Sequence, residues 1–298
     1  MSADPAAAPW TVKRLLEWTS GFFSRKEVDN PRLSAEQLLA HVLNVPRIKL
    51  YTDYEHVLSS EELARYRELV RRASEEEPIA YLTGRAHFFN LEFEVTRDVL
   101  IPRPDTETLV ENVLQLARRE TGFESPRVLE VCTGSGCIAA AIAHHQKHAT
   151  IVATDISEAA LAVARGNIDR LGLSERITLL QGDLYEPLAG LVDQHPFDLI
   201  VSNPPYIATA KVAELDRSVR EYEPMVALDG GADGLAVHRR LFEGAAQRLR
   251  SGGRIFFEIA FDQAEQVLAL ASDFVDFVEP RILRDHAGND RVLTALRK

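Results

Sequence analysis

The four residues Asn203-Pro204-Pro205-Tyr206 carry groups that could hold a planar amino group. The amide of Asn203 offers an acceptor oxygen and a donor nitrogen, and Tyr206 offers a flat ring for stacking. The two prolines have a fixed φ and no N–H, so they form a rigid turn whose carbonyl oxygens can accept hydrogen bonds. The turn could bind both hydrogens of an –NH2 group and leave the nitrogen lone pair exposed. By itself the motif could equally be only the end of a strand.

A glycine-containing turn provides a second candidate site. Thr133-Gly134-Ser135-Gly136 lies between an apolar segment at residues 127–131 and an alanine-rich segment at residues 138–143. Glycines in such a turn let the backbone approach a ligand closely. Asp155 ends the next apolar segment and follows Gly134 by about 20 residues, the spacing at which a carboxylate binds the hydroxyls of a ribose.

A third apolar segment, residues 177–180, is followed by another acid, Asp183. Its carboxylate could accept a hydrogen bond from an adenine amino group, and Leu184 and Tyr185 could cover the adenine ring. The same glycine turn also satisfies the dinucleotide fingerprint, so an NAD-linked oxidoreductase is the alternative. Two observations count against it: no Ser/Tyr/Lys or His/Asp set for hydride transfer stands out, and the Asn-Pro-Pro-Tyr turn would have no use.

The elements that must position these groups alternate between strand and helix. Apolar segments typical of strands occur at residues 127–131, 150–154, 177–180, 197–201, 254–259, 275–283 and 291–296, with helical segments between most of them. This alternation predicts an α/β domain with a largely parallel sheet, helices on both faces and an antiparallel edge. The candidate residues would then gather at the carboxyl ends of neighbouring strands, where open α/β sheets bind ligands.

The remaining sequence suggests two further regions. Residues 1–80 show helical periodicity, with capping-box patterns at Ser34 and Gln37 and at Ser59 and Glu62, and we expect a small helical domain that serves for docking or as a scaffold. Residues 81–100 are expected to form a connector with a β-hairpin turned at Asn90, and residues 101–298 the catalytic domain. The long segment 207–234 is expected to cover the substrate or to be a surface insertion.

Composition limits the possible partners. The net charge is −11, and nearly all of it falls beyond residue 85, which disfavours stable nucleic-acid binding and suits a basic protein partner. No apolar run spans a bilayer and the first residues lack a signal pattern, so we expect a cytoplasmic protein without a membrane partner. The two cysteines, Cys132 and Cys137, complete no metal-ligand set, and no metal is expected.

Together these residues resemble the S-adenosylmethionine-dependent methyltransferases that modify planar nitrogens, and within them the HemK/PrmC family, the glutamine methyltransferases of peptide chain release factors. Nearly the whole chain from about Leu33 takes part in the resemblance. Supporting stretches are Pro78-Ile79-Ala80-Tyr81-Leu82-Thr83-Gly84, Ile101-Pro102-Arg103-Pro104-Asp105-Thr106-Glu107, Tyr222-Glu223-Pro224, Gly230-Gly231-Ala232-Asp233-Gly234, Glu258 and Asp290-Arg291-Val292.

Three departures from the family pattern are small. Cys132 stands where the family commonly has glycine, so the turn there cannot adopt a positive φ without strain. Glu130 is one methylene longer than the usual acid, and Ile259-Ala260 replaces a frequent His-Gly.

The resemblance implies a class I, Rossmann-like methyltransferase fold with S-adenosylmethionine as cofactor. It assigns cofactor binding to Glu130, Cys132, Thr133, Gly134, Ser135, Gly136, Asp155, Ile156, Asp183, Leu184, Tyr185 and Asn203. It assigns catalysis to Asn203, Pro204 and Tyr206, and substrate binding to these three with Pro205, Arg103 and Phe89. No catalytic base is assigned.

The resemblance also implies the substrate, which is the glutamine of the Gly-Gly-Gln loop of release factors. It implies that the helical domain at residues 1–80, with the connector, docks the rest of this substrate protein, and we expect the enzyme to be a monomer. Two alternatives stay open. One is a glutamine methyltransferase of a ribosomal protein, and the other is an adenine-N6 methyltransferase of nucleic acid, because the latter enzymes share Asn-Pro-Pro-Tyr.

Overall fold

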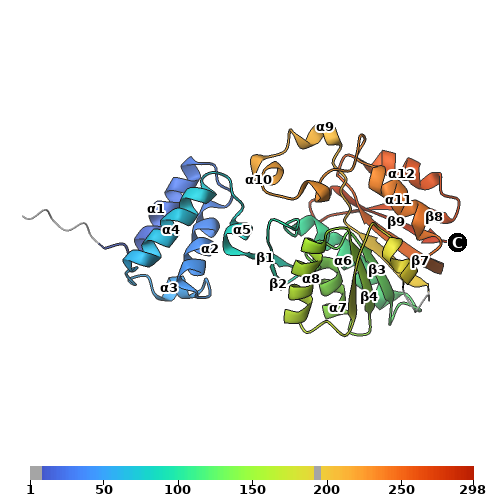
Figure 1. Ribbon diagram of the computed structural model, residues 1–298, viewed down its shortest axis with the longest axis horizontal. Helices are drawn as coiled ribbons and strands as arrows, with labels where there is room; N and C mark the ends of the chain where they lie inside the picture. Colours follow the sequence, from blue (N-terminus) through green and yellow to red (C-terminus); the bar gives the residue numbers. More distant parts are fainter. Residues whose placement is uncertain (1–8, 191–195) are drawn as a thin grey trace, which may run out of the picture. The chain divides into compact units, whose positions relative to one another are not determined.

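The computed structural model describes residues 9–190 and 196–298. The chain divides into two compact units, Met1–Gly84 and Arg85–Lys298 (Figure 1). Each unit has a hydrophobic core of its own, so each is described separately. No described helix is both long enough and apolar enough to cross a membrane.

The first unit is built from helices alone. They are α1 (Val12–Arg25), α2 (Pro31–Leu43), α3 (Lys49–Thr52), α4 (Ser60–Ala73) and α5 (Ile79–Thr83). Leu16, Phe23, Leu38, Leu39 and Tyr66 are fully buried in its core, as the apolar periodicity requires.

The two expected helix starts in this unit differ in outcome. The capping box at Ser59 and Glu62 is confirmed, with both of its hydrogen bonds present. The expected box at Ser34 is wrong, because α2 already begins at Pro31. The Ser34 hydroxyl instead donates to the carbonyl of Asp29 at 2.7 Å.

The second unit begins with a β-hairpin, formed by β1 (Arg85–Phe88) and β2 (Leu91–Glu94). Its two turn residues, Phe89 and Asn90, have φ angles of 49° and 61°. Two consecutive residues at positive φ match the twist of the flanking strands, which is the geometry that tight hairpins favour.

A seven-stranded sheet forms the centre of this unit, in the order β5-β4-β3-β6-β7-β9-β8. β9 runs antiparallel to both of its neighbours and the other pairs are parallel, so the predicted α/β sheet with an antiparallel edge is confirmed. The strands are β3 (Arg127–Val131), β4 (Thr150–Asp155), β5 (Ile177–Gln181), β6 (Phe197–Ser202), β7 (Leu249–Glu258), β8 (Phe277–Arg284) and β9 (Asp290–Arg297).

Helices cover both faces of the sheet (Figure 1). One core contains residues of α6 (Glu107–Arg119), α7 (Cys137–His145) and α8 (Glu158–Arg170), packed with Val128 and Leu199 of the sheet. The other contains residues of α11 (Ala236–Ala245) and α12 (Ala264–Ser272), packed with Leu129 and Ile200. Adjacent residues of one strand thus enter opposite cores, as the two-residue repeat of a strand requires.

Segment 207–234 leaves the sheet after β6 and contains α9 (Thr209–Val212), α10 (Arg217–Arg220) and the 3-10 turn Met225–Ala227. Its two ends are joined by backbone hydrogen bonds, from Ile207 to the carbonyl of Leu228 at 3.0 Å and from Gly230 to the carbonyl of Ile207 at 2.8 Å. The segment is therefore a closed excursion, and it returns to the edge of the sheet where β6 ends.

Candidate active site

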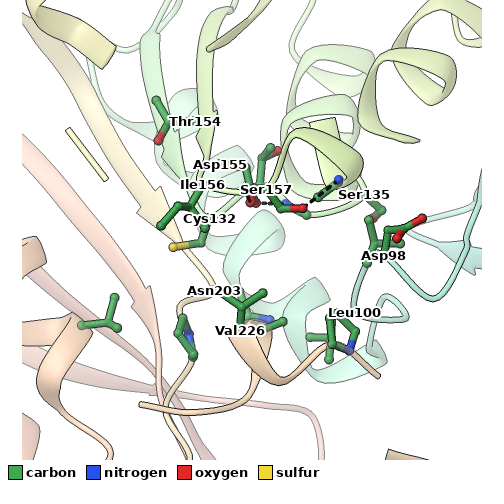
Figure 2. Close-up of a pocket in the computed structure, with 18 of the residues that line it drawn as sticks. Asp98, Leu100, Cys132, Ser135, Thr154, Asp155, Ile156, Ser157, Asn203 and Val226 are labelled. Carbon is green, nitrogen blue, oxygen red and sulfur yellow. Dashed lines mark hydrogen bonds between the residues drawn. The ribbon is translucent and has the colours of Figure 1, made fainter. Parts of the chain in front are cut away.

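A cavity of about 520 Å³ lies at the carboxyl ends of the central parallel strands (Figure 2). The residues that follow β3, β4, β5 and β6 line it, as expected for an open α/β sheet. Residues 98–106 and 224–229 contribute the remaining wall, with Leu100 and Val226 across the cavity from Cys132 and Asp155 in Figure 2.

The turn after β3 contributes Cys132, Thr133, Gly134 and Ser135 to the lining. Its backbone is tied to the next strand, since Thr133 donates to the carbonyl of Thr154 at 3.0 Å and Gly134 to Oδ2 of Asp155 at 2.8 Å. Cys132 has a φ of 61°, which is strained for a residue with a side chain. The turn therefore has the geometry for which the family commonly uses glycine.

Glu130 lies behind this turn and not in the cavity. It is fully buried, and its Oε2 accepts hydrogen bonds from Oγ1 of Thr133 at 2.8 Å and from the amide of Ala139 at 3.0 Å. Burial raises the pKa of Glu130 to about 8. The structure thus places Glu130 as the support that joins the turn to the start of α7.

Gly136 also lies outside the cavity lining, at the N-cap position of α7 with a φ of 78°. A Cβ atom there would approach Cβ of Ala164 to 3.2 Å, so the glycine serves helix packing.

Asp155, the last residue of β4, and Ile156, which follows it, both line the cavity. Oδ1 of Asp155 accepts from the amide of Ser157 at 2.9 Å, and Oδ2 accepts from Gly134. Burial raises the pKa of Asp155, and these amide donors oppose the rise. Because each carboxylate oxygen can accept a second hydrogen bond, Asp155 keeps acceptor capacity for a pair of hydroxyls. Ile156 is 53% exposed and gives the cavity an apolar surface beside this acid.

After β5, Asp183 and Leu184 line the cavity, and Arg240 of α11 lies 2.8 Å from Oδ2 of Asp183. Tyr185 does not line it. The Tyr185 ring is buried beneath Arg248, and its hydroxyl donates to the carbonyl of Leu241 at 2.7 Å. Of the two residues expected to cover a planar ligand, Leu184 lies at the cavity and Tyr185 does not.

After β6, Asn203 and Pro205 line the cavity, whereas Pro204 and Tyr206 do not. Nδ2 of Asn203 donates to Oγ1 of Thr106 at 3.1 Å, which fixes the amide at one end. The hydroxyl of Tyr206 donates to Oε1 of the buried Glu258 at 3.2 Å, and burial raises the pKa of Tyr206. Tyr206 therefore anchors the turn and does not present its ring to the cavity.

The two other predicted substrate contacts also differ in position. Arg103 lines the cavity, and its Nη2 lies 2.5 Å from Oε1 of Glu223. Phe89 does not line the cavity. Its amide donates to Oε1 of Glu107 at 2.7 Å, and its ring meets His145 edge-on at 5.0 Å, so the hairpin turn is held against α6 and α7.

Several lining residues were not predicted from the sequence, among them Asp98, Thr106, Met225, Val226 and Arg240. Thr106 occupies the N-cap position of α6, but its side chain makes no capping bond. Its place in the Arg-Pro-Asp-Thr-Glu stretch was the available signal. No sequence signal pointed to Arg240, because its partner Asp183 is 57 residues away in the chain.

The charges around the cavity fit a cationic ligand. Asp98, Asp155, Asp183 and Asp229 line it, and its two arginines, Arg103 and Arg240, are each engaged by a carboxylate. An excess of carboxylates stabilises a nearby positive charge. The lining residues therefore fit S-adenosylmethionine, which combines a sulfonium and an amino group with a ribose and a planar base. Among the described residues, no three His, Cys, Asp or Glu side chains gather as a metal site.

Comparisons with known proteins agree with this arrangement. The model of the PrmC N-terminal domain matches residues 14–84, and that of the methyltransferase small domain matches residues 105–219. Among solved structures, the catalytic domain of hMettl16, determined in complex with MAT2A 3'UTR hairpin 6, is similar with a TM-score of 0.54. That likeness covers 70% of this chain and 76% of the other at 17% identity, so it shows the fold alone.

Curated relatives are similar over nearly the full length. A release factor glutamine methyltransferase of Rhodopirellula baltica is 44% identical over 96% of both chains. One of Geobacter sulfurreducens is 44% identical over 95% of this chain and 96% of the relative. The chain therefore belongs to the family of release factor glutamine methyltransferases, as its Arg-Pro-Asp-Thr-Glu and Asn-Pro-Pro-Tyr stretches predict.

Proposed function

We propose that this chain transfers a methyl group from S-adenosylmethionine to the side-chain amide nitrogen of the glutamine in the Gly-Gly-Gln motif of peptide chain release factors. The observation that carries this proposal is the anchored amide of Asn203. Its Nδ2 is engaged by Thr106, and its Oδ1 has no hydrogen-bond partner among the residues that the structure describes. This leaves an acceptor at the cavity for a substrate N–H.

The second acceptor that we assign is the backbone carbonyl of Pro204. Asn203 and Pro205, on either side of it, both line the cavity. With one amide hydrogen on Oδ1 of Asn203 and the other on the Pro204 carbonyl, the glutamine nitrogen is held with its lone pair turned away from both acceptors. This positioning matters because an amide nitrogen is a poor nucleophile and gains most from correct orientation.

The cofactor site that we assign is the row of strand ends of β3, β4 and β5, beside this turn at the same edge of the sheet. The backbone at Cys132–Ser135 allows close approach, Asp155 receives the ribose hydroxyls, and Asp183 with Leu184 and Ile156 receives the base. When bound, S-adenosylmethionine supplies an electrophilic methyl group on a sulfonium. The chain's part is to hold the amide nitrogen in line, and no strong base is needed because the nitrogen becomes acidic once it is methylated.

We assign docking of the release factor to the helical unit. Trp10, Trp18 and Phe22 surround an aromatic hollow of about 360 Å³ in that unit, and Trp18 is 49% exposed and stacks on Phe22 with ring centroids 5.2 Å apart. Exposed aromatic groups of this kind are enriched at protein interfaces. We also propose that the enzyme is cytoplasmic and monomeric and that it has no stable nucleic-acid partner.

The test is methyl transfer from labelled S-adenosylmethionine to three substrates in parallel: a release factor, ribosomal proteins and an adenine-containing oligonucleotide. Label on the release factor, abolished by Asn203→Ala, is the expected result. Label on a ribosomal protein or on adenine instead would keep the fold and the cofactor and would overturn the substrate.

A further inference from the structure

A buried chain of polar groups lies directly behind Asn203. Its members are Thr106, which is 2% exposed, and Glu258, which is 1% exposed. Nδ2 of Asn203 donates to Oγ1 of Thr106 at 3.1 Å, and the hydroxyl of Tyr206 donates to Oε1 of Glu258 at 3.2 Å. The other carboxyl oxygen of Glu258, Oε2, is buried without a hydrogen-bond partner among the described residues, and the Thr106 hydroxyl is a neighbouring donor that acts on this carboxyl group. Buried polar groups are costly unless they are paired, so a chain of this kind fixes the direction of each bond along it.

The hydroxyl of Thr106 is free for this use because it does not cap its helix. Thr106 is the last residue of a 3-10 turn (Pro104–Thr106) and has helical backbone angles, φ −65° and ψ −20°. A capping threonine ordinarily has an extended backbone, and its oxygen accepts from an amide two or three residues on. Removal of this hydroxyl is therefore not expected to cost the capping energy of α6.

The chemistry of the three groups sets the direction of the bonds. An ionised carboxylate only accepts, and a hydroxyl has one hydrogen to give. Burial raises the pKa of Glu258 to about 7, so its ionised form is populated at neutral pH and dominates above it. When the Thr106 hydroxyl donates a hydrogen bond to Glu258, its lone pairs remain to accept from Nδ2 of Asn203. Oδ1 is then the end of the Asn203 amide that faces the cavity. Without that acceptor the Thr106 hydroxyl can donate to Oδ1, and the amide can turn its –NH2 end outward.

We propose that Thr106 and Glu258 are positioning residues that keep Oδ1 of Asn203, and not Nδ2, directed at the methyl-accepting group. This inference rests on the proposed function and adds a determinant of specificity to it. An outward Oδ1 accepts from the –NH2 of glutamine. An outward Nδ2 would instead meet that –NH2 donor to donor and would suit the carboxylate of a glutamate.

The test compares four full-length proteins: wild type, Thr106→Val, Thr106→Ser and Thr108→Val. Valine keeps the shape of threonine and removes the hydroxyl. Thr108 is the matched control, because it is also buried, at 4% exposure, lies in the first turn of the same helix and does not line the cavity. Each protein is assayed for S-adenosylmethionine affinity, for kcat and KM with a release factor, and for inhibition by a release factor in which Gly-Gly-Gln is changed to Gly-Gly-Glu.

In Thr106→Val we expect kcat to fall about tenfold or more with little change in S-adenosylmethionine affinity, because one buried hydrogen bond has been lost. We also expect the inhibition constant of the Gly-Gly-Glu release factor, divided by KM for the unchanged release factor, to fall several-fold in this variant. Thr106→Ser should restore both values, and Thr108→Val should match wild type.

An unchanged kcat and an unchanged Gly-Gly-Glu inhibition in Thr106→Val would overturn the positioning role. An equal effect of Thr108→Val would do the same, since it would indicate a general packing defect. If wild type itself does not methylate any release factor, the proposed function fails, and that result is distinct from both.

Discussion

Arg103 and Glu223 are 120 residues apart in the sequence and form an ion pair in which Nη2 lies 2.5 Å from Oε1. Arg103 belongs to the extended wall at residues 98–106, and Glu223 precedes the cavity residues Pro224 and Met225. The pair therefore joins segment 207–234 to residues 98–106, the two parts of the same wall of the cavity. Arg103, which the resemblance assigned to the substrate, thus links these two segments.

Glu223→Gln is expected to weaken that attachment. Glu223 is 7% exposed, and its Oε2 has no partner among the described residues, so the charge of Arg103 is the main compensation for burying it. We expect KM for the release factor to rise roughly tenfold, about 1.4 kcal/mol, with a smaller effect on S-adenosylmethionine affinity. Glu221→Gln in the same segment is the matched control, because Glu221 pairs with Arg217 at an exposed position. Equal KM values for the two variants would contradict this role.

Cys132 offers a test of backbone strain. Its φ of 61° favours glycine, so Cys132→Gly should be more stable than Cys132→Ala by roughly 0.5–1 kcal/mol. At an ordinary loop position the order is reversed, because glycine loses more conformational entropy on folding. The free energy of unfolding of both variants in urea is the measurement. A more stable alanine variant would show that the turn is unstrained.

Glu130 predicts a pH dependence of stability. Its pKa is raised from the ordinary value of 4.5 to about 8, because burial disfavours the charged form. Between these two pH values the folded state binds more protons than the unfolded state, so this group's contribution to stability falls as pH rises. The difference in free energy of unfolding between Glu130→Gln and wild type should therefore shift in favour of the variant by about 1 kcal/mol or more when the pH is raised from 5 to 8.5.

The control for this experiment is Glu175→Gln, at an exposed carboxyl group that has no burial to relieve. Denaturant unfolding at both pH values, for wild type and for the two variants, supplies the data. A difference between Glu130→Gln and wild type that stays constant with pH, or that shrinks, would argue against a buried and largely neutral Glu130.

Removal of residues 1–84 tests the role assigned to the helical unit. Every residue that lines the cavity belongs to the second unit, which has cores of its own. We expect calorimetry to find S-adenosylmethionine affinity within a few-fold of the full chain. The value of kcat/KM for the release factor should fall by at least a hundredfold, about 2.7 kcal/mol, because the docking contacts are lost. An equal loss of S-adenosylmethionine affinity and of kcat/KM would contradict the assignment of release-factor docking to the helical unit.

The sequence was sufficient to predict the sheet and the row of strand-end residues. Apolar segments of fixed length and period define the strands, and parallel strands bring Cys132, Asp155, Asp183 and Asn203 to one edge regardless of side-chain detail. Strand boundaries differed by at most two residues except at β7, which begins at Leu249 and not at residue 254. Gly252, with a φ of 73°, allows the strand to continue through an irregular register opposite β6.

Contacts between side chains that are distant in sequence could not be predicted in this way. Glu130 and Tyr206 carry groups suitable for ligand binding, yet one supports the turn after β3 and the other anchors the turn after β6 to Glu258. Local periodicity does not encode the loop conformation or the rotamer that turns such a group toward or away from a cavity. The predictions of no metal, a monomeric state and a cytoplasmic location remain predictions.

The most direct test of the central claim is peptide mass spectrometry of a release factor after incubation with this protein and S-adenosylmethionine. A gain of one methyl group on the Gly-Gly-Gln peptide, with fragment ions that place it on the glutamine side chain, is the expected result. It should be absent with Asn203→Ala and with a Gly-Gly-Glu release factor. Methylation at another residue, or methylation that persists in the Asn203→Ala protein, would contradict the role assigned to the Asn-Pro-Pro-Tyr turn.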